Sequence, residues 1–159
     1  MKLFKKEKMM LFPIDGKLVP LSEVPDEAFS SGMLGIGFAV IPTAGTVYAP
    51  MEGQIESVTD ARHAYTILGE DGTELLVHIG IDTVTLGGTG FLPMVCEGDR
   101  VKAGDVLARV ELDVLREASL PLHTVVLITN PETVQDLQLS EGKGLGGKSE
   151  AARYRSVRN

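Results

Sequence analysis

With 159 residues, the chain is long enough to bury one substantial hydrophobic core and too short for two ordinary domains. Its net charge of -7, from 15 basic and 22 acidic residues, argues against a nucleic-acid partner, because phosphate backbones are bound by clustered positive charge. Cys96 is the only cysteine, which excludes an internal disulfide, and no apolar run approaches the roughly 20 residues of a membrane-spanning helix, so we predict a cytoplasmic protein.

The first ten residues predict a flexible, basic N-terminal leader. Its lysines and apolar residues favour at most weak contact with an anionic membrane surface. Such a short leader suggests a free-standing protein rather than a domain of a larger permease. Residues 11–142 are then expected to form one domain, and residues 143–159, which are rich in glycine and charge, an irregular C-terminal strand or tail.

Short apolar runs separated by Gly, Pro and Asp follow one another about every ten residues, which is typical of an all-β sandwich or barrel. The expected strands are Leu11–Pro13, Gly16–Pro20, Gly37–Pro42, Thr46–Tyr48, Gly53–Val58, Tyr65–Leu68, Glu74–Ile79, Gly90–Phe91, Arg100–Val101, Val106–Glu111 and Thr124–Thr129. Helical signals are limited to Pro25–Phe29, Asp113–Ala118 and Asn130–Asp136. None of these is long enough to connect parallel strands, so the sheets are expected to be antiparallel.

A hairpin signal brings His63 and His78 together. Asp71-Gly72 is a preferred two-residue turn because a type I′ turn needs positive φ at both central positions, and it makes the histidines diagonal neighbours on one face. A Glu70-Asp71 turn places them directly opposite each other, and only a three-residue turn is expected to separate them. Two imidazoles that face each other can share a metal ion, share a proton or pass on a charged group.

Further residues around and beyond this hairpin form a recognisable pattern. They are His63-Ala64, Glu74–Val84, Leu86, Gly88, Gly90-Phe91, Val101–Asp105, Val24–Asp26, Phe29, Ala49-Pro50, Gly53 and Asn130. The pattern spans roughly residues 11–142, is most specific from Leu75 to Thr83, and resembles the glucose-type enzyme IIA of the bacterial sugar phosphotransferase system.

Two segments, Ala49–Ile55 and Gly98–Leu107, also resemble parts of biotinyl and lipoyl carrier domains. Those carriers present a modifiable lysine, usually between methionines, and this chain has no Met-Lys-Met. The likeness therefore concerns the fold and implies an antiparallel barrel-sandwich hybrid with a few short helical turns, in which glycine supplies tight turns.

The resemblance to enzyme IIA implies a phosphocarrier that requires no cofactor. In this family one histidine accepts a phosphoryl group from the phosphocarrier protein HPr and passes it to the IIB domain of a sugar permease, and a second histidine stabilises the group. By position, His78 is the phosphohistidine and His63 its helper. An unperturbed histidine pKa of about 6.5 leaves most of His78 neutral, so it can attack phosphorus without a dedicated base.

Asp82 follows the His78 strand, where the family also has an acidic residue. It is expected to orient an imidazole or to take part in docking HPr, although an aspartate here also fits a turn cap. A flat apolar rim around the histidines is expected to bind the partners and to exclude water. The candidates for this rim are Ile36, Phe38, Val40, Ile81 and Val84. Bare apolar residues of this kind also fit a core, and the resemblance favours Phe38 and Val84.

Two positions depart from the family pattern. Gly35-Ile36-Gly37 stands where the family usually has Gly-Asp-Gly, which removes an acidic residue near the site. Ala61 stands two positions before His63, where the family commonly has threonine, so a hydroxyl that fixes the His63 ring is expected to be missing.

Two alternative functions have weaker support from the sequence. Unphosphorylated His63 and His78 fit a regulatory module that binds permeases or enzymes and shares a zinc ion with its partner, since two imidazoles supply only half of the four ligands that zinc prefers. A metallopeptidase of a related fold needs a His-x-His pair with a further His and Asp, and the chain contains no His-x-His.

Overall fold

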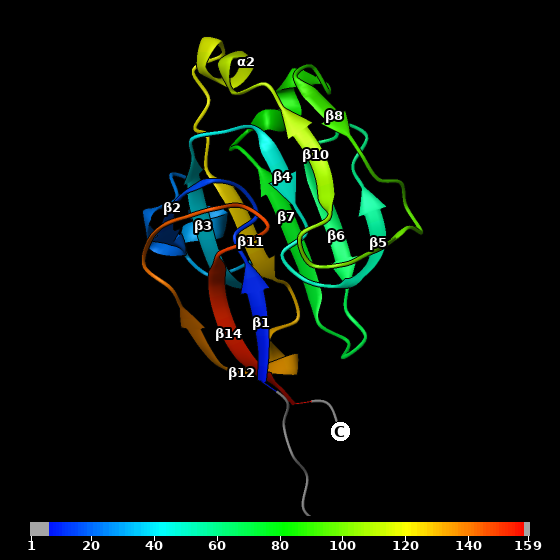
Figure 1. Ribbon diagram of the computed structural model, residues 1–159. Coiled ribbons are helices and arrows are strands. Elements are labelled where there is room, and N and C mark those ends of the chain that lie inside the picture. Colours follow the sequence, from blue (N-terminus) through cyan, green and yellow to red (C-terminus); the bar gives the residue numbers. More distant parts are fainter. Residues whose placement is uncertain (1–6, 158–159) are drawn as a thin grey trace, which may run out of the picture.

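The computed structural model describes residues 7–157, which form antiparallel strands joined by tight turns and a few short helices (Figure 1). The strands are β1 (Glu7–Leu11), β2 (Gly16–Pro20), β3 (Ile36–Pro42), β4 (Thr46–Tyr48), β5 (Gly53–Val58), β6 (Ala64–Leu68), β7 (Glu74–Ile79), β8 (Phe91–Pro93), β9 (Arg100–Val101), β10 (Val106–Val110), β11 (Thr124–Ile128), β12 (Val134–Leu139), β13 (Gly142–Gly144) and β14 (Glu150–Ser156). The helices are α1 (Glu27–Ser30) and α2 (Leu112–Glu117), and the 3₁₀ turns are η1 (Leu21–Glu23), η2 (Thr83–Leu86) and η3 (Pro131–Thr133).

The strands make one large sheet and two small ones. The large sheet has eight strands in the order β13-β2-β3-β11-β7-β6-β5-β9, and the small sheets have the orders β1-β14-β12 and β4-β10-β8. Figure 1 shows both small sheets in front of the large one, with β1, β14 and β12 in the lower part and β4, β10 and β8 in the upper part. The prediction of an antiparallel all-β sandwich with short helical turns is confirmed.

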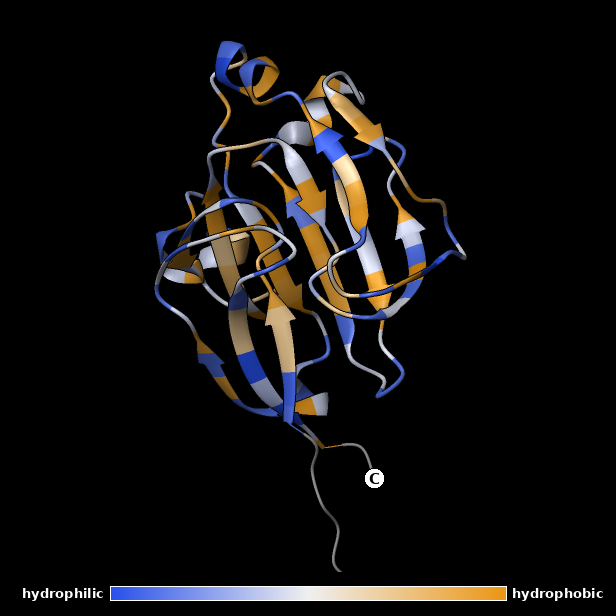
Figure 2. Cartoon of the chain, viewed as in Figure 1, coloured by the Kyte–Doolittle hydropathy of each residue, from blue (hydrophilic) through white to orange (hydrophobic). Residues whose placement is uncertain are grey.

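Central strands of the large sheet are covered on both faces. In β3, Phe38 and Val40 point into the main core between the sheets, whereas Ala39 points into a second, smaller core. That smaller core includes Val125 of β11 and Phe29 of α1, so α1 and η1 cover the outer face of the sheet here. Figure 2 shows the apolar colouring concentrated along these strands and the hydrophilic colouring at turns and edges. Apolar residues in these strands are therefore buried whichever way they point.

The N-terminal prediction was wrong for Glu7 to Met10. These residues form β1, which pairs with β14 in the register Glu7↔Arg155 to Met10↔Ala152, and the Met10 side chain is fully buried. Residues 1–6, and with them most of the predicted contact with an anionic membrane surface, lie outside the described residues.

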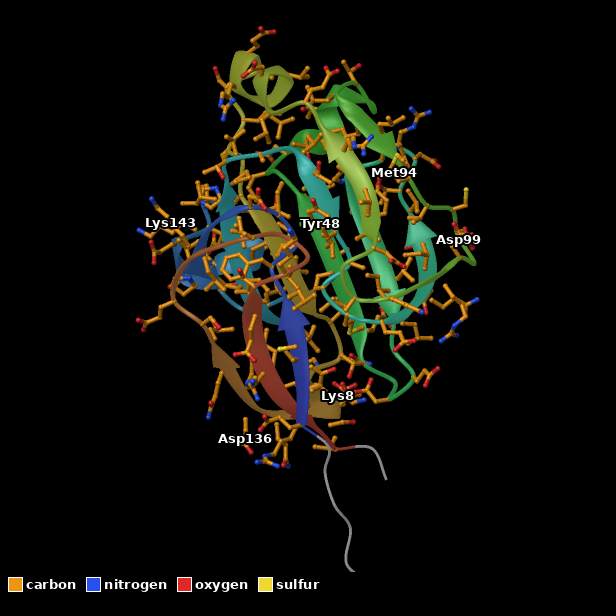
Figure 3. All side chains as sticks on the ribbon, viewed as in Figure 1. Lys8, Tyr48, Met94, Asp99, Asp136 and Lys143 are labelled. Carbon is orange, nitrogen blue, oxygen red and sulfur yellow. The ribbon has the colours of Figure 1, made fainter. Side chains whose placement is uncertain are left out.

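The C-terminal segment is more regular than the predicted irregular strand or tail. Its strands β12 and β14 pair with each other, and β13 pairs with β2. Glycines let the segment approach its neighbours closely: a Cβ on Gly146 would lie 2.7 Å from the Tyr48 ring and 2.8 Å from Cα of Ile14. Figure 3 labels Tyr48 near the centre of the molecule. The glycine content of this segment thus reflects close packing rather than a loose tail.

Helical signals gave mixed results. Asp26 caps α1, because its side chain accepts hydrogen bonds from the N–H groups of Ala28 at 3.0 Å and Phe29 at 3.3 Å. The helix predicted at Asp113–Ala118 is α2, which begins one residue earlier. The helix predicted over Asn130–Asp136 was wrong, because only the turn η3 forms and the chain then enters β12.

Candidate functional site

The β6–β7 hairpin that carries the histidines closes with a three-residue loop, not with either predicted two-residue turn. The N–H of Gly72 donates to the carbonyl of Gly69 at 3.0 Å, and the N–H of Gly69 donates to the carbonyl of Thr73 at 2.9 Å. Gly72 has a φ of 86°, the left-handed conformation that completes a three-residue loop built on a type I turn. The resulting register places Ala64, not His63, opposite His78.

The two histidines nevertheless meet. Their ring centroids lie 4.8 Å apart at an interplanar angle of 86°. Strand β6 begins only at Ala64, and Arg62 just before His63 has a left-handed φ of 62°, so the strand alternation no longer decides where the His63 ring points. The expectation that a three-residue turn separates the pair was therefore wrong.

The backbone after His78 fixes the orientation of its ring. The His78 Nδ1 lies 2.8 Å from the carbonyl oxygen of Gly80. A carbonyl oxygen has no proton to give, so Nδ1 carries the proton and donates, and Nε2 keeps its lone pair. Gly80 has a φ of 72°, and a Cβ there would lie 2.5 Å from the Thr83 methyl group and 2.8 Å from the Leu115 side chain, so both the backbone and the packing favour glycine. This tight turn presents an unprotonated Nε2 on a partly exposed histidine.

Both imidazoles are held in their neutral form. Burial, together with the nearby His63, lowers the pKa of His78 to about 4, against smaller opposing effects of the Gly80 carbonyl and the Asp26 and Asp82 carboxylates. Burial also lowers the pKa of His63. Near neutral pH, neither ring carries a charge before a ligand or partner arrives.

Helix α1 supplies a wall of the site that was not predicted from the sequence. The Phe29 ring packs edge-on against His78, with centroids 5.1 Å apart, and the Asp26 cap fixes the start of the helix. Both residues belong to the family pattern, and the Pro-Asp start of a short helix was visible in the sequence. Their proximity to His78 was not visible, because it depends on how α1 folds over β11 and β7.

Asp82 adopts a left-handed φ of 59° at the start of η2 and is exposed. The turn-cap interpretation was wrong for its side chain, because that side chain makes no capping hydrogen bond; the Asp82 backbone carbonyl instead accepts from the Thr85 hydroxyl at 2.8 Å. The carboxylate is close enough to His78 to favour its protonated form. A negative charge therefore stands beside the histidine pair at the surface.

Three of the five rim residues were wrongly assigned to a contact surface. Phe38 and Val40 are completely buried in the main core, and Ile81 is 1% exposed in the smaller core. Ile36 is half-buried against the main core, whereas Val84 is 58% exposed. An apolar run cannot distinguish an outward face from a second buried face, and here α1 and η1 cover the outer one.

Two exposed apolar residues were missed. Met33 is 76% exposed and Leu34 is 44% exposed, directly after α1 and before β3. Large apolar side chains at such exposure in a turn are candidates for contact with a partner. Their signal in the sequence was weak, because one Met-Leu pair between glycines resembles an ordinary loop.

The hydroxyl expected to be missing at Ala61 is supplied from another position. The Thr59 Oγ1 lies 3.2 Å from His63 Nδ1. Within residues 7–157, no group of three or more His, Cys, Asp and Glu side chains is arranged to hold a metal ion. His63 and His78 offer two ligands, so a zinc ion shared with a partner stays a prediction.

Comparisons with known proteins identify the family. The model of the phosphoenolpyruvate-dependent sugar phosphotransferase system, EIIA 1, matches residues 8–134. The glucose-specific EIIA component of Borreliella burgdorferi is 37% identical over 142 residues, which cover 88% of this chain and 75% of that protein. The glucose permease IIA from Mycoplasma capricolum has a TM-score of 0.90 at 34% identity, with 96% of this chain and 99% of that chain covered. The chain belongs to the EIIA 1 family.

Some relatives are much longer proteins. The glucose-specific EIICBA component of Streptococcus pneumoniae is 40% identical over 139 residues, which cover 87% of this chain and 19% of that protein. Two further relatives, a glucosamine-specific EIICBA and a mannose-specific EIIBCA component, are covered over 20% and 17% of their lengths. The chain thus spans about a fifth of these relatives. In the part of the chain that the structure describes, no helix has the length and apolar character needed to cross a membrane.

Proposed function

We propose that this protein is a phosphocarrier of the sugar phosphotransferase system. It accepts a phosphoryl group from phospho-HPr on His78 and donates it to the IIB domain of a sugar permease, in the cytoplasm. Family membership supports the system, and the relatives that combine EIIA with permease components support a permease partner. The observation that carries the assignment of His78 is its Nδ1 hydrogen bond to Gly80 at 2.8 Å, which leaves Nε2 as the nucleophilic nitrogen.

The transfer needs no general base. The Nε2 lone pair of neutral His78 forms a bond to phosphorus, the bond from phosphorus to the donor nitrogen breaks, and its electron pair leaves with HPr. The low pKa of His78, about 4, keeps this lone pair available at neutral pH. Because the transferring group has a loose transition state with charge on its equatorial oxygens, the site mainly has to position hydrogen-bond donors around it.

His63 is placed to stabilise the transferred group. Its ring lies 4.8 Å from that of His78, centroid to centroid, within reach of a phosphoryl group on Nε2. The phosphoryl group brings negative charge, which favours protonation of His63 and so adds a cationic donor when it is needed. Partners are expected to dock on the exposed Val84, Met33 and Leu34, with Asp82 contributing charge.

The test is to incubate the protein with phosphoenolpyruvate, enzyme I and HPr and to measure its intact mass. One added phosphate that is labile in acid and stable in base supports a phosphohistidine. His78→Ala should abolish this uptake, and His123→Ala, which changes the third histidine, should retain it. Stoichiometric labelling of the folded His78→Ala variant, or no labelling of the unchanged protein, would contradict the proposal.

A further inference from the structure

The hydroxyl of Thr59 joins the end of β5 to the start of β6. Its Oγ1 accepts a hydrogen bond from the N–H of Ala64 at 3.2 Å and lies 3.2 Å from the Nδ1 of His63. The same Oγ1 lies 3.4 Å from the carbonyl oxygen of Ala64, which is a longer distance. One hydroxyl thus lies between a backbone N–H, a backbone carbonyl and an imidazole nitrogen.

The distances favour one acceptor for the hydroxyl proton. The Ala64 carbonyl already accepts the backbone N–H of Thr59 at 3.1 Å, and its separation from Oγ1 is the longest of the three. The Ala64 N–H occupies an acceptor site of Oγ1. Of the two possible acceptors, His63 Nδ1 is the closer one, at 3.2 Å from Oγ1, and the hydroxyl proton is therefore expected to point toward it.

We propose that Thr59 is the positioning residue for His63 and that its hydroxyl donates to Nδ1. Nδ1 is then an acceptor, so the single proton of the neutral ring stays on Nε2. The consequence for transfer rests on the proposed function: His63 presents an Nε2–H donor, whereas His78 presents a bare Nε2. A phosphoryl group between them meets one nucleophile and one donor.

The backbone holds Thr59 and His63 in this relation. The N–H of Arg62 donates to the carbonyl of Thr59 at 2.8 Å, and the left-handed φ of 62° at Arg62 turns the chain back. The N–H of Ile79 in turn donates to the carbonyl of His63 at 2.7 Å. The His63 backbone is therefore fixed from two sides, and Thr59 fixes the remaining freedom of its ring.

This arrangement also explains how the chain manages without a hydroxyl at Ala61. The methyl group of Ala61 cannot donate a hydrogen bond, and Thr59 supplies an equivalent donor two positions earlier in the sequence. Thr59 is itself in an exposed position after the last residue of β5, so a change there does not disturb the core.

The experiment compares Thr59→Val, which keeps the shape and removes the hydroxyl, with Thr59→Ser, which keeps the hydroxyl. Thr43→Val, at an exposed threonine in the β3–β4 connection, is the matched control. The nitrogen resonances of the 15N-labelled imidazoles report which nitrogen of His63 carries the proton. The unchanged protein, Thr59→Ser and Thr43→Val should show the proton on Nε2, and Thr59→Val should show a mixture of both tautomers.

Kinetics of the two half-reactions provide the second readout. Loss of one neutral hydrogen bond predicts that Thr59→Val donates to a IIB domain about three- to tenfold more slowly, with recovery in Thr59→Ser. A proton on Nδ1 of His63 in the unchanged protein would overturn the proposal, as would a Thr59→Val variant with unaltered tautomers. Because the resonances are measured without HPr, they decide the role of Thr59 even if the protein accepts no phosphate.

Discussion

His63 and His78 have the same type of side chain but make different hydrogen bonds. The His78 Nδ1 donates to a carbonyl, which leaves its Nε2 unprotonated, whereas the His63 Nδ1 lies beside a hydroxyl that can donate to it. Two neutral imidazoles in contact can therefore take opposite parts in one transfer, one as nucleophile and one as donor. Their neighbours, Gly80 and Thr59, determine which part each takes.

His63→Gln separates these two parts. The glutamine amide keeps an N–H donor of similar reach, so we expect His78 to accept phosphate from HPr at a near-normal rate. The amide cannot become cationic, so donation to a IIB domain should slow by roughly 100-fold. Both half-reactions are measured by rapid quenching of the purified variant. Loss of acceptance in a folded variant would show that the nucleophile and the helper have been reversed.

Asp82→Asn tests the carboxylate beside the pair. If this charge acts in docking HPr, transfer should slow several-fold at low ionic strength, and the difference should shrink as salt screens it. Asp136→Asn is a matched control, because Asp136 is also exposed and has a similar left-handed φ of 55° against 59° for Asp82, and because asparagine tolerates that conformation. Figure 3 shows Asp136 at the lower edge of the molecule. Equal rates for both variants at every salt concentration would remove Asp82 from docking.

At the scale of strands and helices, local sequence signals predicted some elements and missed others for identifiable reasons. Alternating or β-branched runs between glycines and prolines predicted β2, β4, β5 and β7 with the bounds that the structure has. The strand β14 was expected only as an irregular strand or tail, because its sequence, Glu-Ala-Ala-Arg-Tyr-Arg-Ser, has few β-branched residues and is held in place by β1 and β12 from distant parts of the chain.

The same limit explains the rim. In β3, residues Phe38, Ala39 and Val40 are all fully buried, so no face of the strand is polar and the pattern contains no sign of which side meets solvent. The cover over one face comes from α1 and η1, which precede β3 in the chain. Only the folded arrangement distinguishes the exposed Val84 from the buried Ile81, three residues before it.

Asp26→Ala tests the attachment of α1. Removal of the cap should reduce the free energy of unfolding by about 1 kcal/mol. It should also loosen the contact of Phe29 with His78, and so reduce the rate of phosphate transfer. Urea denaturation and the transfer assay measure the two effects. Glu27→Ala is the control, because this exposed residue in the first turn supplies no cap; a similar loss in both variants would argue against a specific role of the Asp26 side chain.

At the scale of the whole molecule, the site was easier to predict than the elements around it. The predicted hairpin loop was wrong by one residue, yet His63 and His78 are in contact, because Arg62 breaks the strand alternation before His63. The contact depends on the left-handed φ of Arg62, and arginine has no preference for that conformation from which it could have been predicted. The contact with Phe29 depends on packing between elements far apart in sequence and had no local signal.

A chain that ends at Ser149 tests whether β14 is part of the domain. The deletion removes the buried Ala151, Ala152 and Tyr154 and leaves β1 and β12 without their shared partner. We expect it to lose cooperative unfolding or to unfold at a much lower urea concentration, as measured by circular dichroism. Arg153→Ala, which keeps the strand and removes exposed ion pairs, should leave the free energy of unfolding almost unchanged, because ion pairs in contact with solvent contribute little to stability. Normal stability of the shortened chain would show that β14 is dispensable.

The pairing of β1 with β14 determines where the histidine pair would point if the domain were attached to another protein through either end of the chain. Glu7 pairs with Arg155, because the two strands are antiparallel neighbours. The start of β1 and the end of β14 lie together at the lower end of the molecule in Figure 1. Strand β7 runs toward the opposite end, where α2 lies. Shortly after β7, the N–H of Ile81 donates to the carbonyl of Pro121, which follows α2 in the chain. A flexible linker attached before β1 or after β14 would therefore have the same origin and the same reach, and in either case the histidine pair would face away from its anchor, toward whatever the linker allows it to meet.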